Sequence, residues 1–211
     1  MTLTHFIDIS RYQNPKKINW REVGRTQAFV VIKATEGVNF IDRYLNQHVK
    51  ECRKHNIPFG LYHFARPDRK NGGYKKDAKA EALDFCKQLK EYSDFTVLPV
   101  LDLEYEETPL SRSELTEWCE VFASTVKKEV GRDIIVYGNY YYLRDQLSAS
   151  HNLGRFPLWI AQYNNKDAPD RIPPAWKTWS MWQYTDKWVD HHMYDGPLDA
   201  NWIKDIDLIC R

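Results

Sequence analysis

The sequence has no excess of charge of either sign and no long apolar run. Its 30 lysines and arginines nearly balance 29 aspartates and glutamates, which leaves a formal net charge of +1. Because proteins that bind nucleic acid draw their affinity from clustered cations, this balance predicts no nucleic-acid partner. No apolar stretch approaches the roughly 18–20 residues that cross a bilayer, so we expect no membrane partner either.

Cysteine is scarce as well, with four residues and neither a Cys-x-x-Cys pair nor the spacing of a zinc site. Cys52, Cys86 and Cys119 fall in segments that we expect to be helical, where a buried free thiol is the commoner outcome. We therefore expect reduced cysteines, Cys210 included. The 7 histidines contain no His-Glu-x-x-His pair, and the adjacent His191 and His192 are typical of an exposed loop. The sequence thus predicts no metal site and no cofactor.

What the chain does contain is typical of one packed domain: 211 residues, 43% hydrophobic and 28% charged. Aromatic residues make up 14%, and most of the 8 tryptophans lie in the last third of the chain. Most of these rings are expected in the core, although flat aromatic faces also suit C–H-rich ligands such as sugars.

Short β-rich runs alternate with longer helical ones. Between residues 74 and 92, for example, Ala78, Ala82, Phe85 and Leu89 recur at helical spacing. Further helices are expected over 41–56, from a capping box at Ser111 to a stop at Gly131, and briefly after residue 138. The expected strands are 6–9, 29–33, 59–64, 96–103, 134–138, 158–161, 180–184 and 198–202.

Five strand–helix alternations followed by three plainer strands predict an α/β protein. Strands that read as buried and parallel, with helices outside, favour an irregular TIM-like barrel whose last part has lost its helices. We find no internal repeat and no linker, so we expect a single domain.

Acidic residues follow several of the expected barrel strands, where barrels of this kind carry their catalytic groups. Asp8 ends the first strand, and the fourth ends in Asp102 and Glu104, which lie one residue apart and so point to the same face. Asp199 lies in the last strand, which neighbours the first if the barrel closes. The sequence therefore predicts a cluster of these carboxyl groups over one barrel mouth.

Such a cluster suits glycoside hydrolysis. Like charges in a partly dry cleft cannot all ionise, so one carboxyl keeps a raised pKa while another stays anionic. A proton donor and an anion are what cleavage of a glycosidic bond requires. No Gly-x-Ser-x-Gly elbow, phosphate loop or dinucleotide fingerprint points to a different chemistry.

The stretch from Arg66 to Lys79 is rich in cations. Runs of this kind usually form a solvated surface, and that is our interpretation here. Attraction to anionic cell-wall polymers is the sharper alternative.

Seven segments in order, spanning nearly the whole chain, resemble glycoside hydrolase family 25, the Chalaropsis-type lysozymes of phage endolysins, bacteria and some fungi. The segments are Asp8-Ile9-Ser10-Arg11-Tyr12-Gln13, Ile32-Lys33-Ala34-Thr35-Glu36-Gly37, Gly60-Leu61-Tyr62-His63-Phe64-Ala65, Pro99-Val100-Leu101-Asp102-Leu103-Glu104, Pro157-Leu158-Trp159-Ile160-Ala161-Gln162-Tyr163, Trp182-Gln183-Tyr184-Thr185 and Asp199-Ala200-Asn201.

The resemblance implies a (β/α)5(β)3 barrel that cleaves the β-1,4 bond between N-acetylmuramic acid and N-acetylglucosamine in bacterial peptidoglycan. By motif it assigns Glu104 as the acid, with Asp102, Asp8 and Asp199 in support. The positions that match pocket-lining residues of the family are Tyr62, Lys33, Phe64, Tyr137 and Gln162.

We expect this catalytic domain to cover residues 1–211, without a separate wall-binding domain, and to act as a monomer. The N-terminal residues Met1 to Asp8 show no basic region followed by an apolar stretch, so no secretory signal is predicted. Release in the manner of an endolysin, or another export route, would bring such an enzyme to the wall.

Two other functions and two mechanisms stay open at this point. A chitinase-like barrel also carries Asp-x-Glu on its fourth strand, but its longer acidic run would need acids where this chain has Val97 and Val100. A non-catalytic sugar-binding barrel usually loses a catalytic acid. Attack by the substrate's own 2-acetamido group, positioned by Asp102, is the favoured mechanism, and direct attack by water is the alternative.

Overall fold

The computed structural model describes residues 3–204. The helices are α1 (Trp20–Thr26), α2 (Leu45–Lys54), α3 (Tyr74–Glu91), α4 (Arg112–Val130) and α5 (Tyr140–Asp145), with 3₁₀ turns at Pro15–Lys17 and Leu153–Arg155. The strands are β1 (Thr4–Ile9), β2 (Val30–Glu36), β3 (Phe40–Ile41), β4 (Phe59–Phe64), β5 (Val100–Asp102), β6 (Ile135–Asn139), β7 (Leu158–Ala161), β8 (Met181–Asp190) and β9 (Tyr194–Ile203).

A closed barrel is the centre of the fold. Neighbouring strands pair in the order β1-β2-β4-β5-β6-β7-β8-β9, and β9 pairs back to β1. The pairs from β1 to β8 are parallel, whereas β9 runs antiparallel to both of its neighbours. The short β3 only extends the edge of β2. Five βα units and three final strands thus confirm the predicted α/β barrel of the irregular TIM-like kind.

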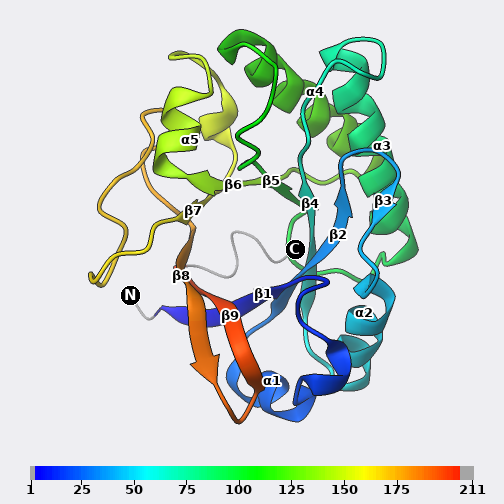
Figure 1. The fold of residues 1–211 in the computed structure, drawn as a ribbon, viewed down its shortest axis with the longest axis vertical. Coiled ribbons are helices and arrows are strands. Elements are labelled where there is room, and N and C mark those ends of the chain that lie inside the picture. The colour runs from blue at the N-terminus through cyan, green and yellow to red at the C-terminus, as the bar shows by residue number, and fades with distance from the viewer. Residues whose placement is uncertain (1–2, 205–211) are drawn as a thin grey trace.

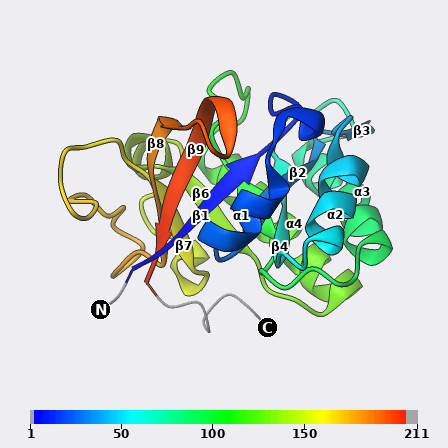
Figure 2. The same ribbon diagram turned by 90° about the horizontal axis from the view of Figure 1, so that it is seen from below.

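The helices cover only part of this barrel. In Figure 1, α2, α3 and α4 lie outside the strands from β2 to β5, whereas a long connection without a helix joins β7 to β8. Figure 2 shows β8 and β9 side by side next to β1, in agreement with their pairing. The last strands therefore close the barrel by hydrogen bonding to one another, without helices outside them.

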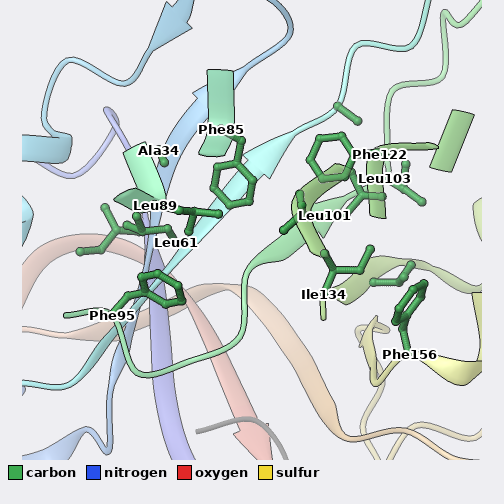
Figure 3. Packing of buried hydrophobic residues seen from close by; sticks show 14 of the residues in the cluster. Ala34, Leu61, Phe85, Leu89, Phe95, Leu101, Leu103, Phe122, Ile134 and Phe156 are labelled. Atoms are coloured by element: carbon green, nitrogen blue, oxygen red, sulfur yellow. The ribbon is translucent and has the colours of Figure 1, made fainter. Parts of the chain in front are cut away.

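Two apolar clusters hold the barrel together. Between sheet and helices, side chains such as Leu61, Phe85, Leu101 and Phe122 pack closely (Figure 3). Inside the barrel a second cluster includes Phe6, whose ring stacks on Phe29 with centroids 4.4 Å apart. The remaining members of the inner cluster are Val31, Val97, Leu98, Val100, Ile135, Tyr137, Trp159, Met181 and Ile203. The interior is consequently a packed core, and a ligand can enter only at a mouth.

The predicted ends of α4 are confirmed in detail. The Ser111 hydroxyl accepts from the Glu114 backbone N–H, and the Glu114 carboxylate accepts in return from the Ser111 N–H. At the other end Gly131 has φ 73°, the left-handed conformation that glycine adopts without steric cost.

Four expected elements differ most in their bounds. The strand expected over 96–103 is only Val100–Asp102, because Pro99 has no N–H to continue the ladder. The helix expected over 41–56 begins at Leu45, since Phe40–Ile41 pairs with β2 instead. β8 and β9 are twice the expected length, because beyond Gln183 they pair mainly with each other through an irregular ladder.

One helix was not predicted. Helix α1 begins after Asn19, whose side chain accepts from the Glu22 N–H, and it packs Trp20 and Val23 inward. The cap residue was the available signal, but seven residues with Gly24 among them give too short a periodic pattern to stand out.

The remaining sequence features are placed as follows. Cys52, Cys86 and Cys119 are buried free thiols, as expected, and Cys210 lies outside the described residues. His191 and His192 are exposed in the turn between β8 and β9. Among residues 3–204 no helix has both the length and the apolarity of a bilayer span.

The cation-rich stretch is more ordered than a solvated loop. Arg66 pairs with Glu36, and Arg69 pairs with Glu114 at the start of α4. From Tyr74 onward the stretch continues as the first turns of α3. Several of its charges are therefore neutralised within the chain, so its surface is less cationic than the sequence indicates.

Candidate active site

A pocket of about 210 Å³ opens at the mouth of the barrel where the parallel strands end. Val100 and Trp159 of the inner cluster form part of its apolar wall. The rest of the lining is polar and comes from β1, β4, β5, β6, β8 and β9 or from residues just beyond strand ends: Asp8, Tyr62, Asp102, Glu104, Tyr137, Tyr163, Gln183 and Asp199. The structure thus brings the four predicted acids to one site.

Asp8 and Asp199 lie directly opposite each other on β1 and β9. Burial, and after it the charge of Asp199, raise the pKa of Asp8 well above its ordinary value. Burial also raises the pKa of Asp199 to about 6. Two buried acids on adjacent strands therefore resist ionisation, and the ionised form of each disfavours that of the other.

Asp102 and Glu104 form a second pair. Asp102 is buried at the end of β5, and burial together with the charge of Glu104 raises its pKa well above the usual range. Its Oδ1 is buried and has no hydrogen-bond partner. Glu104 lies two residues further on, at the exposed rim, yet the surrounding walls of the site raise its pKa too. An orphaned buried oxygen beside a protonatable rim acid is suited to receive a ligand N–H.

Hydrogen bonds from two amide side chains hold the Asp8 carboxyl group in place. Its Oδ2 accepts from Asn201 Nδ2 at 2.8 Å and from Gln183 Nε2 at 3.1 Å. Gln183 Oε1 in turn accepts from the hydroxyl groups of Tyr137 at 2.8 Å and Tyr163 at 2.7 Å. Because each amide is held in a single orientation by these contacts, the site is organised before any ligand binds.

Of the five predicted pocket residues, Tyr62 and Tyr137 line the acid pocket. Burial raises the pKa of both phenols well above 10, so they stay neutral hydroxyl groups. Since a neutral hydroxyl both donates and accepts a hydrogen bond, either residue can contact a sugar without adding charge.

Lys33, Phe64 and Gln162 do not line this pocket. Lys33 is buried, with its Nζ 2.6 Å from Glu36 Oε2 and 4.5 Å from the centre of the Phe64 ring. Its charge nevertheless lowers the pKa of Asp102 and Glu104 against the effect of burial. Lys33 therefore acts on the acids at a distance, and Phe64 serves as its packing surface.

Gln162 belongs to the neighbouring loop. Its Oε1 accepts from the Asp170 N–H at 2.7 Å and from Asn164 Nδ2 at 3.1 Å. The side chain lines an adjoining cavity. The motif therefore predicted that Gln162 lies near the site, but it did not predict which groups the side chain contacts.

Four residues of the site were not singled out from the sequence: Trp159, Tyr163, Gln183 and Asn201. All of them stand in the quoted motifs. Strand alternation offered a signal for Gln183 and Asn201, since a polar residue on an inward-facing position of a buried strand needs a partner there.

In the described part of the chain no group of three or more histidine, cysteine, aspartate or glutamate side chains has the arrangement of a metal site. The site is thus built from carboxyl, amide and phenol groups.

These features define a closed α/β barrel with a carboxylate-lined mouth, an arrangement that carries reactive groups at strand ends. The family model for glycosyl hydrolases family 25 matches residues 7–192, and the chain belongs to that family. The resemblance found in the sequence is thereby confirmed.

The chain is 30% identical over 204 residues to the uncharacterized protein YegX of Escherichia coli strain K12, and the match covers 93% of this chain and 68% of YegX. It is also 30% identical over 188 residues to Lysozyme M1 of Streptomyces globisporus, across 85% of this chain and 60% of that protein. The solved structure of a family GH25 lysozyme from Aspergillus fumigatus matches with a TM-score of 0.82 and 27% identity, covering 100% of both chains.

Proposed function

We propose that the protein is an N-acetylmuramidase that hydrolyses the β-1,4 bond between N-acetylmuramic acid and N-acetylglucosamine in bacterial peptidoglycan. The observation that carries this proposal is the convergence of Asp8, Asp102, Glu104 and Asp199 on one pocket. Family membership supports the reaction class. Since all four acids belong to one chain, the proposed enzyme needs no second copy and acts as a monomer.

Glu104 is the proposed general acid. It stands at the rim with a raised pKa, so it retains a proton at a pH where an ordinary glutamate has lost it. It gives this proton to the glycosidic oxygen while the bond from that oxygen to the sugar carbon C1 breaks. The resulting carboxylate then takes a proton from the water that attacks C1 and so returns to its starting state.

Asp102 positions the internal nucleophile. The carbonyl oxygen of the 2-acetamido group attacks C1, and the acetamido N–H donates to the unpartnered Oδ1 of Asp102. This hydrogen bond favours the anion of Asp102, which leaves the proton of the coupled pair to Glu104. Substrate assistance of this kind departs from the two-carboxylate schemes and forms a cyclic oxazolinium ion instead of a glycosyl-enzyme ester.

Asp8 and Asp199 complete the site. Their carboxyl groups, with Gln183 and Asn201 donating to Asp8, offer fixed polar groups to the hydroxyl groups of the bound sugar ring. A pocket of about 210 Å³ is below the ~300–1,000 Å³ of drug-sized sites, which suits a single ring of a longer strand.

Replacement of the general acid tests the proposal. Glu104→Gln keeps the shape of an exposed side chain, so folding is expected to be intact, and clearing of a bacterial wall suspension should fall roughly 10²–10⁴-fold. Glu91→Gln, at the exposed end of α3, is the matched control and should clear walls like the parent. Near-parental lysis by Glu104→Gln contradicts the assignment, and preferential turnover of chitin oligomers would favour the chitinase-like alternative.

A further inference from the structure

A second cavity of about 590 Å³ adjoins the acid pocket. Glu104, Tyr137 and Tyr163 line both spaces, so the two are continuous around the rim acid. The outer part of the second cavity is formed by the start of α5 and by the loop 162–171. Figure 1 shows α5 and the connection from β7 to β8 on the same side of the barrel.

The position of Glu104 indicates which part of the substrate lies in this cavity. A general acid stands beside the oxygen that leaves, between the ring that is attacked and the ring that departs. The acid pocket holds the attacked ring, so the cavity beyond Glu104 receives the leaving-group side of the strand. This inference rests on the proposed function.

The cavity contains one cation without an ionic partner. Within residues 3–204 Arg171 forms no ion pair, because the neighbouring Asp170 pairs with Lys166. The guanidinium donates to the Tyr141 hydroxyl and lies 5.6 Å from the centre of that ring. Arg171 is exposed to the cavity and keeps several N–H donors for a ligand.

The loop that carries Arg171 is braced. Gln162 accepts from Asp170 and Asn164, and its backbone carbonyl accepts from Trp182 Nε1 at 2.7 Å. Gln162 Nε2 also donates to the carbonyl of Arg171. Because the loop is held by side chains of the barrel, the guanidinium has a defined place before a ligand arrives.

We propose that Arg171, held against Tyr141, binds a carboxylate of the glycan strand on the leaving-group side of the scissile bond. In a strand of alternating amino sugars, the only anions are the lactyl carboxylate of muramic acid and, where present, carboxylates of the attached peptide. Guanidinium matches a carboxylate in a planar, two-point contact, and the neighbouring Tyr140 and Tyr141 offer ring faces to the sugar beside it.

Kinetics on a soluble glycan strand with free lactyl carboxylates test the proposal. Arg171→Gln should raise KM roughly three- to tenfold, with kcat within about twofold, because the lost contact is remote from the bond that breaks. Arg171→Lys keeps the charge but not the planar group, so an intermediate KM is expected. Arg21→Gln, an exposed arginine on α1, is the matched control and should behave like the parent.

The substrate arms identify the carboxylate. On the same strand with methyl-esterified lactyl groups, the parent and Arg171→Gln should have equal KM values. A strand that carries peptide stems distinguishes the sources: a penalty only on the stripped strand assigns the lactyl group, and a penalty only on the stem-bearing strand assigns the peptide. Equal KM values for the parent and Arg171→Gln on both charged strands would overturn the proposal.

Binding to an inactive protein separates this inference from the proposed function. Calorimetric titration of Glu104→Gln and of the Glu104→Gln, Arg171→Gln double variant with the stripped and stem-bearing strands requires no turnover. Weaker binding by the double variant on the strand that Arg171 recognises supports the carboxylate site even if the parent cleaves no peptidoglycan. Equal binding of both strands by the two proteins overturns the site, even when the parent is an active muramidase.

Discussion

Asp8 on β1 and Asp199 on β9 face each other in register at the mouth of the barrel, where burial raises the pKa of both carboxyl groups. The antiparallel return of β9 creates this contact, because it places the last strand beside the first. When both of these neighbouring carboxyl groups ionise, their mutual repulsion destabilises the folded state.

The stability of the fold should therefore depend on pH through Asp199. Its folded pKa of about 6 lies above the unfolded value near 3.9. A raised carboxyl pKa stabilises the fold below the unfolded value, and this contribution is lost as pH rises through about 6. Asp199→Asn removes the loss, so the variant should be more stable than the parent at pH 8 by about 1–2 kcal/mol.

Thermal unfolding of both proteins at pH 4 and pH 8 measures this effect. A gain of this size corresponds to a Tm rise of a few degrees at pH 8, and little difference should remain at pH 4. Asp195→Asn, an exposed carboxylate in the β8–β9 turn region, controls for a simple change of net charge. An Asp199→Asn variant that is less stable than the parent at pH 8 would show that the buried Asp199 carboxylate does not destabilise the fold.

The pH dependence of activity should report Glu104. Because the general acid must be protonated and its pKa is raised, kcat/KM should fall as pH rises through a value above that of an ordinary glutamate near 4.3. A pH–rate profile on solubilised glycan strands measures this limb. Activity that stays constant from pH 4 to pH 9 would exclude a carboxylic acid as the proton donor.

Lys33 should tune the same limb without touching the ligand. Its charge lowers the pKa of both Asp102 and Glu104, so Lys33→Met should move the basic limb to higher pH. Glu36 keeps its ion pair with Arg66 in this variant, which limits the structural damage. Lys16→Met, an exposed lysine in the turn before α1, should leave the profile in place. A direct ligand contact of Lys33 would instead raise KM at every pH.

Asp102 should be required for the internal nucleophile. Asp102→Asn is expected to lower kcat by at least about a hundredfold, because the amide cannot stabilise the positive acetamido group that forms on attack. The anomer that appears first gives the complementary result: internal attack followed by water retains the β configuration, which early NMR spectra of the digest detect. First formation of the α anomer means inversion, as direct attack by water produces, and would refute the assisted mechanism.

Much of this arrangement was predictable from local patterns. Apolar runs and helical periodicity located most strands and the long helices, and the ends of strands located Asp8, Asp102 and Glu104. Asp199 needed one more step, because its place depends on closure between the first strand and the last. The structure shows this closure, since β9 pairs with β1 and brings Asp199 opposite Asp8.

The parts that were missed depend on contacts between distant segments. Gln183 and Asn201 matter because they reach Asp8 from other strands, at sequence separations of 175 and 193 residues. Lys33 matches a pocket position by motif, but in the structure it forms an ion pair with Glu36 and does not line the acid pocket. Arg171 belongs to no motif, and only the adjoining cavity shows where its charge lies.

The most direct test of the account is mass analysis of peptidoglycan digested by the protein and then reduced with borohydride. Cleavage by the proposed muramidase leaves N-acetylmuramic acid at each new reducing end, so the reduced fragments should end in N-acetylmuramitol, and Glu104→Gln should release almost none of them. Fragments that end in reduced N-acetylglucosamine, or an undigested wall, would contradict the central claim.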